Sequence, residues 1–384
     1  MISFRPTAEE NRLLQTARDF AREQIRPQAR LAEELRQVPQ PLLHQASDLG
    51  FFLLELPEWM DGLEFPLTTQ VQVLEELAYG DLGILQGFPG TADASSFFRL
   101  LSENPQIKNS QCSASGCGFG FLDAVSWPSE WGQSLRLERL AHGYELNGHS
   151  QPIRLAHQVA GIIACFCDED GEWLVLLLHQ SETPWTVLAG DIRLGLLAAG
   201  CGRISFDTVW VPEHAVLARG EEAQLLVEQA LSRIYIRQAA AEVGLAKAAL
   251  DYTVEYTAQR QAFGQPIAQF QGVSFLVADM EMEQRAAHHL VWRAAAATDL
   301  GQENAFQYAL EAILRSHRAV SFVTNHAVQL LGGHGFVQEY PVEKWMRDAQ
   351  AQVMLYGCES QFLNQLGERT VSVQNYNRST LTVK

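Results

Sequence analysis

The residues whose types and spacing could do chemistry lie in the last third of the chain, and Tyr356 is the most informative of them. It stands in Tyr356-Gly357-Cys358, directly after a helix-like run from Val342 to Met354. A phenol has a reference pKa near 10, so it is mostly protonated at neutral pH and is a poor general base. Glu359 follows three residues later and could replace it only if the segment were rebuilt. A solvated surface carboxylate is the simpler interpretation of Glu359.

A second group of residues could hold a phosphate-bearing ligand. Arg260 offers an always-charged guanidinium, which suits a pyrophosphate. Gly332-Gly333 carries no side chains, so a ligand could approach the backbone closely. Each signal alone is weak, because glycine pairs commonly end helices and a cation near a helix C-terminus is common. On that simpler interpretation Phe263 would be a core residue.

The elements that must position these residues fall into three blocks. The first two blocks differ in the spacing of their apolar residues. Residues 1–115 carry a capping box at Thr7-x-x-Glu10 and apolar residues at helical spacing, which predicts a helical domain. Residues 116–220 carry short alternating or apolar runs punctuated by Gly, Asn and Pro, such as Ser134–Leu140. That pattern predicts a β-barrel or β-sandwich domain.

The third block, residues 221–384, returns to helical patterns. Long runs rich in alanine and leucine, which are good helix formers, predict four helices at Leu231–Thr257, Gln271–Thr298, Asn304–Leu330 and Val342–Met354. Four long helices in one block indicate a bundle. We therefore predict an α+β chain with a helical N-terminal domain, a middle β domain and a C-terminal four-helix bundle.

Composition excludes several classes of protein. The chain has 384 residues and a net charge of −17, which argues against a nucleic-acid partner. No apolar run reaches the roughly 18 residues of a membrane span, and the N-terminus has no secretory pattern. The six cysteines lack the CxxC pairs of a metal site. Their scatter is typical of a reduced, cytoplasmic protein without metal.

The spacing of several C-terminal motifs resembles the acyl-CoA dehydrogenase family. The motifs that carry the resemblance are Val243-Gly-Leu-Ala246, Arg260-Gln-Ala-Phe-Gly-Gln265, Gln329-Leu-Leu-Gly-Gly-x-Gly335 and Met346-Arg-Asp-Ala349. The predicted α–β–α layout is similar to that family's fold across the whole chain. The resemblance implies a flavoprotein oxidoreductase that acts on an acyl thioester with FAD.

The resemblance also implies how the cofactor would be held. In the family two subunits share each flavin, so we expect an oligomer, made either of identical chains or of this chain and a related dehydrogenase. The residues that would reach the pyrophosphate and adenosine end of a neighbouring subunit's FAD are Arg260, Phe263, Gln271, Gln329, Gly332 and Gly333.

The half of the flavin site that a chain uses for itself departs from the family pattern. The Gly-rich acidic loop is replaced by Leu122–Ser129, which has no glycine, although Trp127 could stack on the ring. Pro152-Ile153-Arg154 stands where the family has a Trp-Ile-Thr strand that cradles the isoalloxazine ring. The stacking aromatic and the small hydroxyl are both missing from this strand.

The residues at the family's two base positions also differ from the family pattern. Tyr356 occupies the place of the family's glutamate, and Ile234 occupies the alternative base position on the first C-domain helix, where Tyr235 follows it. Glu242 lies eight residues further along, about 12 Å up the helix axis, which is too far to substitute.

These losses predict a catalytically incomplete subunit that supports the flavin site of a partner dehydrogenase. The alternative is an active flavoenzyme with altered chemistry, either a dehydrogenase or oxidase of CoA-bound or carrier-bound acyl groups or an oxygenase. A scaffold without flavin is a third possibility, but it leaves the spacing from Arg260 to Gly333 without a reason.

Overall fold

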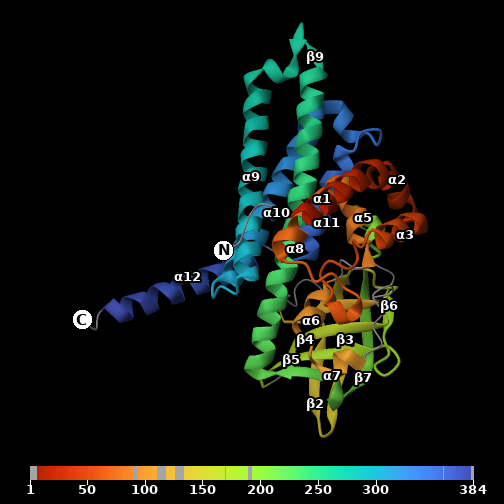
Figure 1. Ribbon diagram of the computed structural model, residues 1–384, viewed down its shortest axis with the longest axis vertical. Helices are drawn as coiled ribbons and strands as arrows, with labels where there is room; N and C mark the ends of the chain where they lie inside the picture. Colours follow the sequence, from red (N-terminus) through yellow and green to blue (C-terminus); the bar gives the residue numbers. More distant parts are fainter. Residues whose placement is uncertain are drawn as a thin grey trace.

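The computed structural model describes residues 7–89, 93–109, 118–125, 134–168, 170–188, 193–357 and 359–381. Its long axis runs from a β domain at one end to a hairpin between two long helices at the other (Figure 1). The predicted fold is confirmed: N-terminal helices, a middle β domain and a C-terminal helical bundle follow one another along the chain. Within the described residues, no helix is long and apolar enough to cross a membrane.

The N-terminal part is a set of mostly short helices that begins with the predicted cap. The Thr7 side chain accepts a hydrogen bond from the Glu10 backbone N–H at 3.2 Å, and the Glu10 carboxylate accepts one from the Thr7 N–H at 2.7 Å. The helices are α1 (Ala8–Phe20), a π-helical turn (Ala21–Ile25), α2 (Arg26–Leu35), α3 (Gln40–Asp48), α4 (Leu67–Gly80), α5 (Leu82–Gln86), α6 (Ala94–Leu100) and α7 (Pro105–Asn109).

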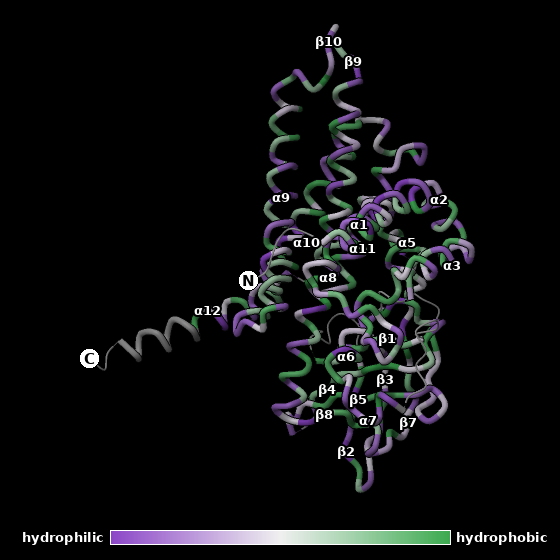
Figure 2. Tube along the Cα trace, viewed as in Figure 1, coloured by the Kyte–Doolittle hydropathy of each residue, from purple (hydrophilic) through white to green (hydrophobic). Residues whose placement is uncertain are grey.

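The middle part consists of two four-stranded sheets. One has the order β1-β4-β5-β8 and the other has the order β2-β3-β7-β6. β1 pairs with β4 in parallel, and the other neighbours are antiparallel. Central strands β4 and β5 are apolar along most of their length because both faces are covered (Figure 2). The strands are β1 (Phe119–Asp123), β2 (Arg136–Leu140), β3 (Gly143–Ile153), β4 (Gly161–Cys167), β5 (Trp173–His179), β6 (Thr186–Leu188), β7 (Gly202–Pro212) and β8 (Val216–Arg219).

The C-terminal part is built around α8, which has 40 residues and so extends for about 60 Å. Its N-terminal half touches the β domain and its far end carries a short hairpin of β9 (Gln261–Ala262) and β10 (Gln265–Pro266) (Figure 1). Helix α12 begins beside α10 and then projects away from the body. The helices are α8 (Gly220–Gln259), α9 (Gln271–Asp299), α10 (Ala305–Leu331), α11 (Val342–Leu355) and α12 (Glu359–Leu381), with a 3₁₀ turn η9 at Gly332–Phe336.

Close backbone packing joins α8 to the N-terminal helices. A Cβ at Gly244 would lie 2.2 Å from the Glu75 carbonyl oxygen of α4, so only glycine fits at this crossing. In the N-terminal half of α8, Arg233 forms a buried ion pair with Glu55 at 2.5 Å. These contacts fix the face of α8 that enters the interior.

Candidate functional site

The structure places Tyr356 in the interior, at the end of α11. Its backbone N–H still bonds to the Gln352 carbonyl at 3.3 Å, and its side chain is 9% exposed. The phenol hydroxyl donates a hydrogen bond to Asp93 Oδ2 at 3.0 Å. Burial raises the pKa of Tyr356 well above its ordinary value, so the group is a hydrogen-bond donor and not a base.

Asp93, immediately before α6, collects three donors at this point. Besides Tyr356, it accepts from Arg154 Nη2 at 3.2 Å and from Gln238 Nε2 at 2.9 Å. Arg154 follows the last residue of β3, and its other terminal nitrogen donates to the Gln86 carbonyl at 3.2 Å. Four segments that are far apart in the sequence therefore meet at one carboxylate. The sequence analysis did not predict this meeting.

Little space is left around this cluster. The cavity that Tyr356 and Arg154 line has a volume of about 50 Å³. Pockets for small ligands and cofactors are commonly about 300–1,000 Å³, so the cavity in this state is far smaller than an acyl chain needs. Its walls are aromatic, apolar and acidic, and include Asp93, Phe119, Phe121, Ile153, Ile234 and Tyr235.

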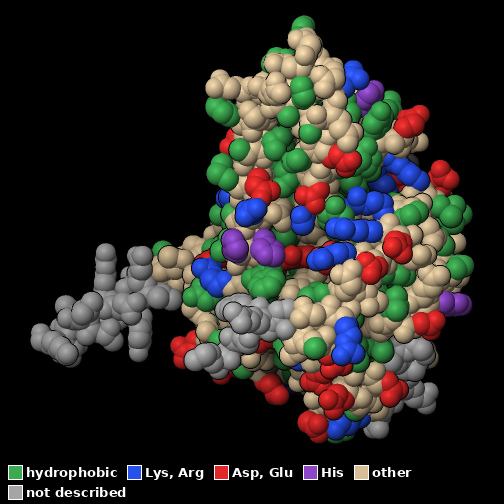
Figure 3. Space-filling model, turned by 45° about the horizontal axis from the view of Figure 1, so that its top comes forward, with side chains coloured by type: hydrophobic (Ala, Val, Ile, Leu, Met, Phe, Trp, Pro, Cys, Tyr) green, Lys and Arg blue, Asp and Glu red, His purple; other side chains and the backbone are tan. Residues whose placement is uncertain are grey.

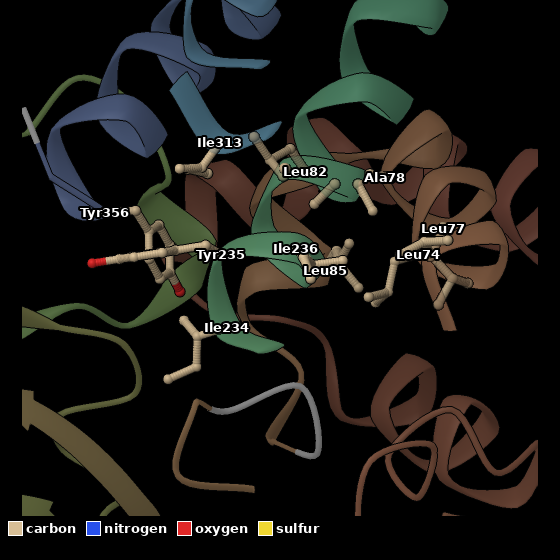
Figure 4. Packing of buried hydrophobic residues seen from close by; sticks show 14 of the residues in the cluster. Leu74, Leu77, Ala78, Leu82, Leu85, Ile234, Tyr235, Ile236, Ile313 and Tyr356 are labelled. Atoms are coloured by element: carbon tan, nitrogen blue, oxygen red, sulfur yellow. The ribbon is translucent and has the colours of Figure 1, made fainter. Parts of the chain in front are cut away.

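Ile234, which the sequence predicts at the alternative base position, offers no carboxylate either. Ile234 is 1% exposed and lies in the apolar packing near Tyr235 and Tyr356 (Figure 4). Burial raises the pKa of Tyr235 far above its ordinary value. Glu359 does not enter the cavity, because its carboxylate pairs with Arg318 at the surface, where both side chains are about half exposed. Asp93 is thus the carboxylate that contacts Tyr356.

A second, larger cleft lies on the other side of Pro152. It has a volume of about 570 Å³ between the β domain and α11, and it shares Gln151, Pro152 and Leu355 with the small cavity. Its lining is mainly apolar, with Leu194, Leu196, Met346 and Met354, and it includes three cations, Arg193, Arg203 and Arg347.

The donor set of this cleft suits a flat ring that carries an anionic tail. The Arg193 Nε is buried and makes no hydrogen bond within the part of the chain that the structure describes. An anionic group would satisfy this donor and its charge. Apolar walls with a nearby guanidinium are compatible with part of a flavin site, but the sequence at Leu122–Ser129 carries no glycine to complete it.

The six residues predicted to reach a neighbour's cofactor lie at the opposite end of α8. Arg260 is the residue that follows α8, and Gln238 lies 22 residues earlier, so the two are about 33 Å apart along the axis. All six are exposed, and Phe263 is 97% exposed, so the simpler interpretation of Phe263 as core is wrong. The six are Arg260, Phe263, Gln271, Gln329, Gly332 and Gly333.

Contacts and backbone conformation within the chain explain a glycine at Gly332 but not at Gly333. Gly332 has φ +58°, a backbone that disfavours other residues, but Gly333 does not. A Cβ on either would meet no described atom within 4 Å, whereas a Cβ on Gly335 would lie 2.3 Å from the Val328 carbonyl oxygen. Gly335 is therefore needed for packing, and Gly333 faces open space.

Arg260 and the glycine turn face a common hollow. Arg260, Tyr256 and His334 line a cavity of about 370 Å³, and the Tyr256 hydroxyl lies 2.9 Å from His334 Nδ1. The structure thus brings together the two motifs that the sequence separates by about 70 residues. Trp127 lies outside the described residues, as do Cys358 and the second half of the Leu122–Ser129 loop.

Comparison with known proteins agrees with this architecture. Two family models match, the acyl-CoA dehydrogenase N-terminal domain over residues 7–95 and the C-terminal domain over residues 221–371. An acyl-CoA dehydrogenase of Bacillus subtilis is 28% identical over 91% of this chain and 95% of its own length. Benzylmalonyl-CoA dehydrogenase of Aromatoleum aromaticum is 26% identical over 97% of this chain and 100% of its own length.

A solved structure gives the same result for the fold. Butyryl-CoA dehydrogenase of Megasphaera elsdenii superposes with a TM-score of 0.83 and 24% identity, over 96% of this chain and 100% of that one. The chain belongs to the acyl-CoA dehydrogenase family, a class of flavoprotein oxidoreductases.

Proposed function

We propose that this protein is an FAD-linked subunit that supports the flavin site of a related dehydrogenase and is itself catalytically incomplete. The observation that carries the proposal is the contrast between the two ends of α8. The exposed end presents Arg260 and the glycine pair, while the buried end replaces the base with a Tyr356 hydroxyl bonded to Asp93.

The buried end is poorly suited to removing a proton from an acyl thioester. A protonated phenol cannot accept the proton, and the loss of a positioned base typically costs 10²–10⁴ in rate. The neighbouring cavity of about 50 Å³ leaves no room for the substrate in this state. Support for the proposal therefore comes from both chemistry and volume.

FAD is the cofactor that we assign to the assembly. When bound, it accepts the hydride that leaves the substrate. In this chain, Arg260 would bind the pyrophosphate of the partner's FAD and Gly333 would let it approach the backbone. The chain's own cleft offers Arg193 and apolar walls, but the family's glycine loop is absent from its sequence.

The partner that we propose is a related acyl-CoA dehydrogenase chain that supplies the base and the glycine loop. Hydrophobic side chains are exposed over the helical end that would meet it (Figure 3). The large ones include Phe263, Phe275, Met282 and Phe336, each more than 60% exposed. Large apolar side chains with this degree of exposure are typical of an interaction surface. The cysteines that the structure describes are unpaired, which favours a cytoplasmic location.

The experiment that tests this proposal uses the assembly purified with a tag on this chain, with Arg260→Glu as the variant. Bound FAD is measured by its absorbance, and its reduction is measured with an acyl thioester. We expect Arg260→Glu to lower the FAD content, because a carboxylate would face the pyrophosphate. The control, Arg139→Glu, changes an exposed arginine on β2 in the distant β domain and should leave FAD unchanged. Equal FAD content in both variants would contradict the proposal.

One observation favours a second candidate, an active flavoenzyme with altered chemistry. The Asp93 carboxylate reaches Tyr356 at 3.0 Å, so the cavity does contain a potential base, delivered from a different segment. On this reading Asp93→Asn would abolish thioester-dependent flavin reduction by the chain alone. On the supporting-subunit reading the chain alone shows no such reduction before or after the change.

A further inference from the structure

A buried acid–imidazole pair lies behind the candidate site, and neither the motifs nor the family comparison assigns it a role. His317 Nδ1 on α10 lies 2.8 Å from Glu242 Oε2 on α8. Their side chains are 3% and 0% exposed. Burial raises the pKa of Glu242, and the charge and hydrogen bond of His317 oppose that effect. Such a pair costs desolvation energy, so a purely passive packing role is a poor reason for it.

Two amides lie between the pair and Tyr356. Gln352 on α11 lowers the pKa of the buried Glu242 carboxylate and donates a hydrogen bond to Gln238 Oε1 at 3.1 Å. Gln238 then donates to Asp93 at 2.9 Å, and Asp93 accepts the Tyr356 hydroxyl. Gln238 and Glu242 are four residues apart, so they stand on the same face of α8.

The direction of these hydrogen bonds is set by the Asp93 carboxylate. Asp93 accepts, so the Gln238 amide turns its NH₂ group toward Asp93, and the Gln352 amide turns its NH₂ group toward Gln238 Oε1. Gln238 Oε1 is left to accept from Gln352 and from Gln86 Nε2 at 2.7 Å. Because a side-chain amide does not readily exchange protons, the chain conveys orientation and not a proton.

His317 also holds the far side of the α11–α12 junction, which we define as Tyr356, Gly357 and Phe362. The His317 ring lies 5.6 Å from the Phe362 ring. The Phe362 ring covers Gly357, where a Cβ would lie 2.9 Å from it, and Gly357 has φ +119°. The junction is thus held through Gln352 on one side and through Phe362 on the other.

We propose that Glu242 and His317 are positioning residues that hold the α11–α12 junction in place and keep the Tyr356 hydroxyl on Asp93. The pair acts from outside the cavity and touches neither Tyr356 nor Asp93. This inference goes beyond the proposed function and does not depend on whether FAD binds to the chain.

The test follows the Tyr356 ring by ¹⁹F NMR of the full chain labelled with 3-fluorotyrosine. The chain has nine tyrosines, and Tyr356→Phe assigns the resonance. Glu242→Leu should displace the Tyr356 resonance by more than its linewidth. Glu242→Gln keeps an acceptor for His317 and should leave the resonance closer to its wild-type position, as a rescue by the conservative variant.

A double variant separates positioning from stability. Glu242→Leu with His317→Leu removes both polar partners, so the stability lost in the single variant should largely return. The Tyr356 resonance should nevertheless remain displaced, because the double variant lacks both the Glu242 carboxylate near Gln352 and the His317 ring that packs against Phe362. The control is Thr253→Val, which removes a local α8 hydrogen bond to the Ala249 carbonyl and should not move the resonance.

Two results would overturn the proposal. One is a double variant whose Tyr356 resonance stands at the wild-type position, and the other is a control that displaces it as far as Glu242→Leu does. If the Glu242 variants do not fold, Gln352→Leu is the second test, since it removes the Gln352 hydrogen bond to Gln238 and leaves the contact between Glu242 and His317 intact. An unmoved Tyr356 resonance in Gln352→Leu would likewise contradict the proposal.

Discussion

The Tyr356 hydroxyl donates to Asp93 at 3.0 Å, although 263 residues separate them in the sequence. This contact joins the end of α11 to the start of α6, at the position that the sequence predicts to correspond to the family's catalytic glutamate. A carboxylate is therefore present at the position, but as the acceptor of a phenol, an amide and a guanidinium. The oxygens of Asp93 accept hydrogen bonds that join segments of the protein interior.

The first prediction concerns this carboxylate. Asp93→Leu removes the acceptor from three largely buried donors and leaves the Arg154 charge without its ion-pair partner at 3.2 Å. Breaking a buried pair in this way costs about 3–5 kcal/mol, whereas Asp93→Asn keeps an acceptor oxygen and should cost less. Urea denaturation measures both values. Asp251→Leu, at a partly exposed surface ion pair, serves as the control and should change stability by less than about 1 kcal/mol. A cost for Asp93→Leu no larger than that of the control would show that the cluster is not structural.

The second prediction restores the residue type of the family. Tyr356→Glu should not give the purified chain thioester-dependent dye reduction, because the cavity of about 50 Å³ remains and the new carboxylate would face Asp93. Tyr356→Phe is the matched variant that removes only the hydroxyl. If Tyr356→Glu showed turnover and Tyr356→Phe did not, the prediction would be wrong. The missing base alone would then explain the lack of activity.

The third prediction compares two glycines in the same turn. Gly333→Ala should leave the free energy of unfolding unchanged within about 0.5 kcal/mol, since its Cβ would meet no described atom. It should nevertheless lower the FAD content of the assembly. Gly335→Ala should destabilise the chain, because its Cβ would lie 2.3 Å from the Val328 carbonyl oxygen. The prediction fails if Gly333→Ala leaves the FAD content at the wild-type level.

The fourth prediction concerns stability against pH. Burial alone would raise the pKa of Glu55, but Arg233, Arg237 and Arg99 outweigh it and lower the pKa from 4.5 to about 2. A carboxylate with a lowered pKa stabilises the folded state above its unfolded pKa, here by about 3 kcal/mol. That contribution is lost as the pH falls from about 4.5 toward 2, with about 1 kcal/mol gone by pH 4.

Denaturation curves of the wild type and Glu55→Gln between pH 7 and pH 4 isolate this contribution, because other carboxylates titrate in both proteins. The difference in the free energy of unfolding should be constant from pH 7 to about pH 5.5 and should shrink below that. A difference that grows toward pH 4 would mean that the Glu55 pKa is not lowered.

Much of the fold could be predicted because its signals are local. The alanine-rich run at Leu231–Thr257 lies inside α8, and the run at Val342–Met354 matches α11 to within one residue. The capping box at Thr7 and Glu10 has both of its expected hydrogen bonds. Helix propensity, capping and alternation depend on neighbouring residues, so one sequence is enough to read them.

The candidate site could be predicted less well from the sequence, because its contacts join segments that are far apart along the chain. Nothing around Asp93 marks it as a partner of Tyr356, and no local pattern brings α6 to the end of α11. Glu242 illustrates the same limit. Its distance from Ile234 along α8 correctly excludes it as a base, but the sequence gives no sign that His317 of α10 meets it in the interior.

The most direct test of the supporting-subunit account is the visible absorption spectrum of this chain, purified alone after incubation with excess FAD and removal of unbound cofactor. The account predicts much less than one FAD per chain, because the chain lacks the glycine loop of its own site and has no partner to complete the exposed one. One FAD per chain, bound in a homo-oligomer whose flavin is bleached by an acyl thioester, would contradict it.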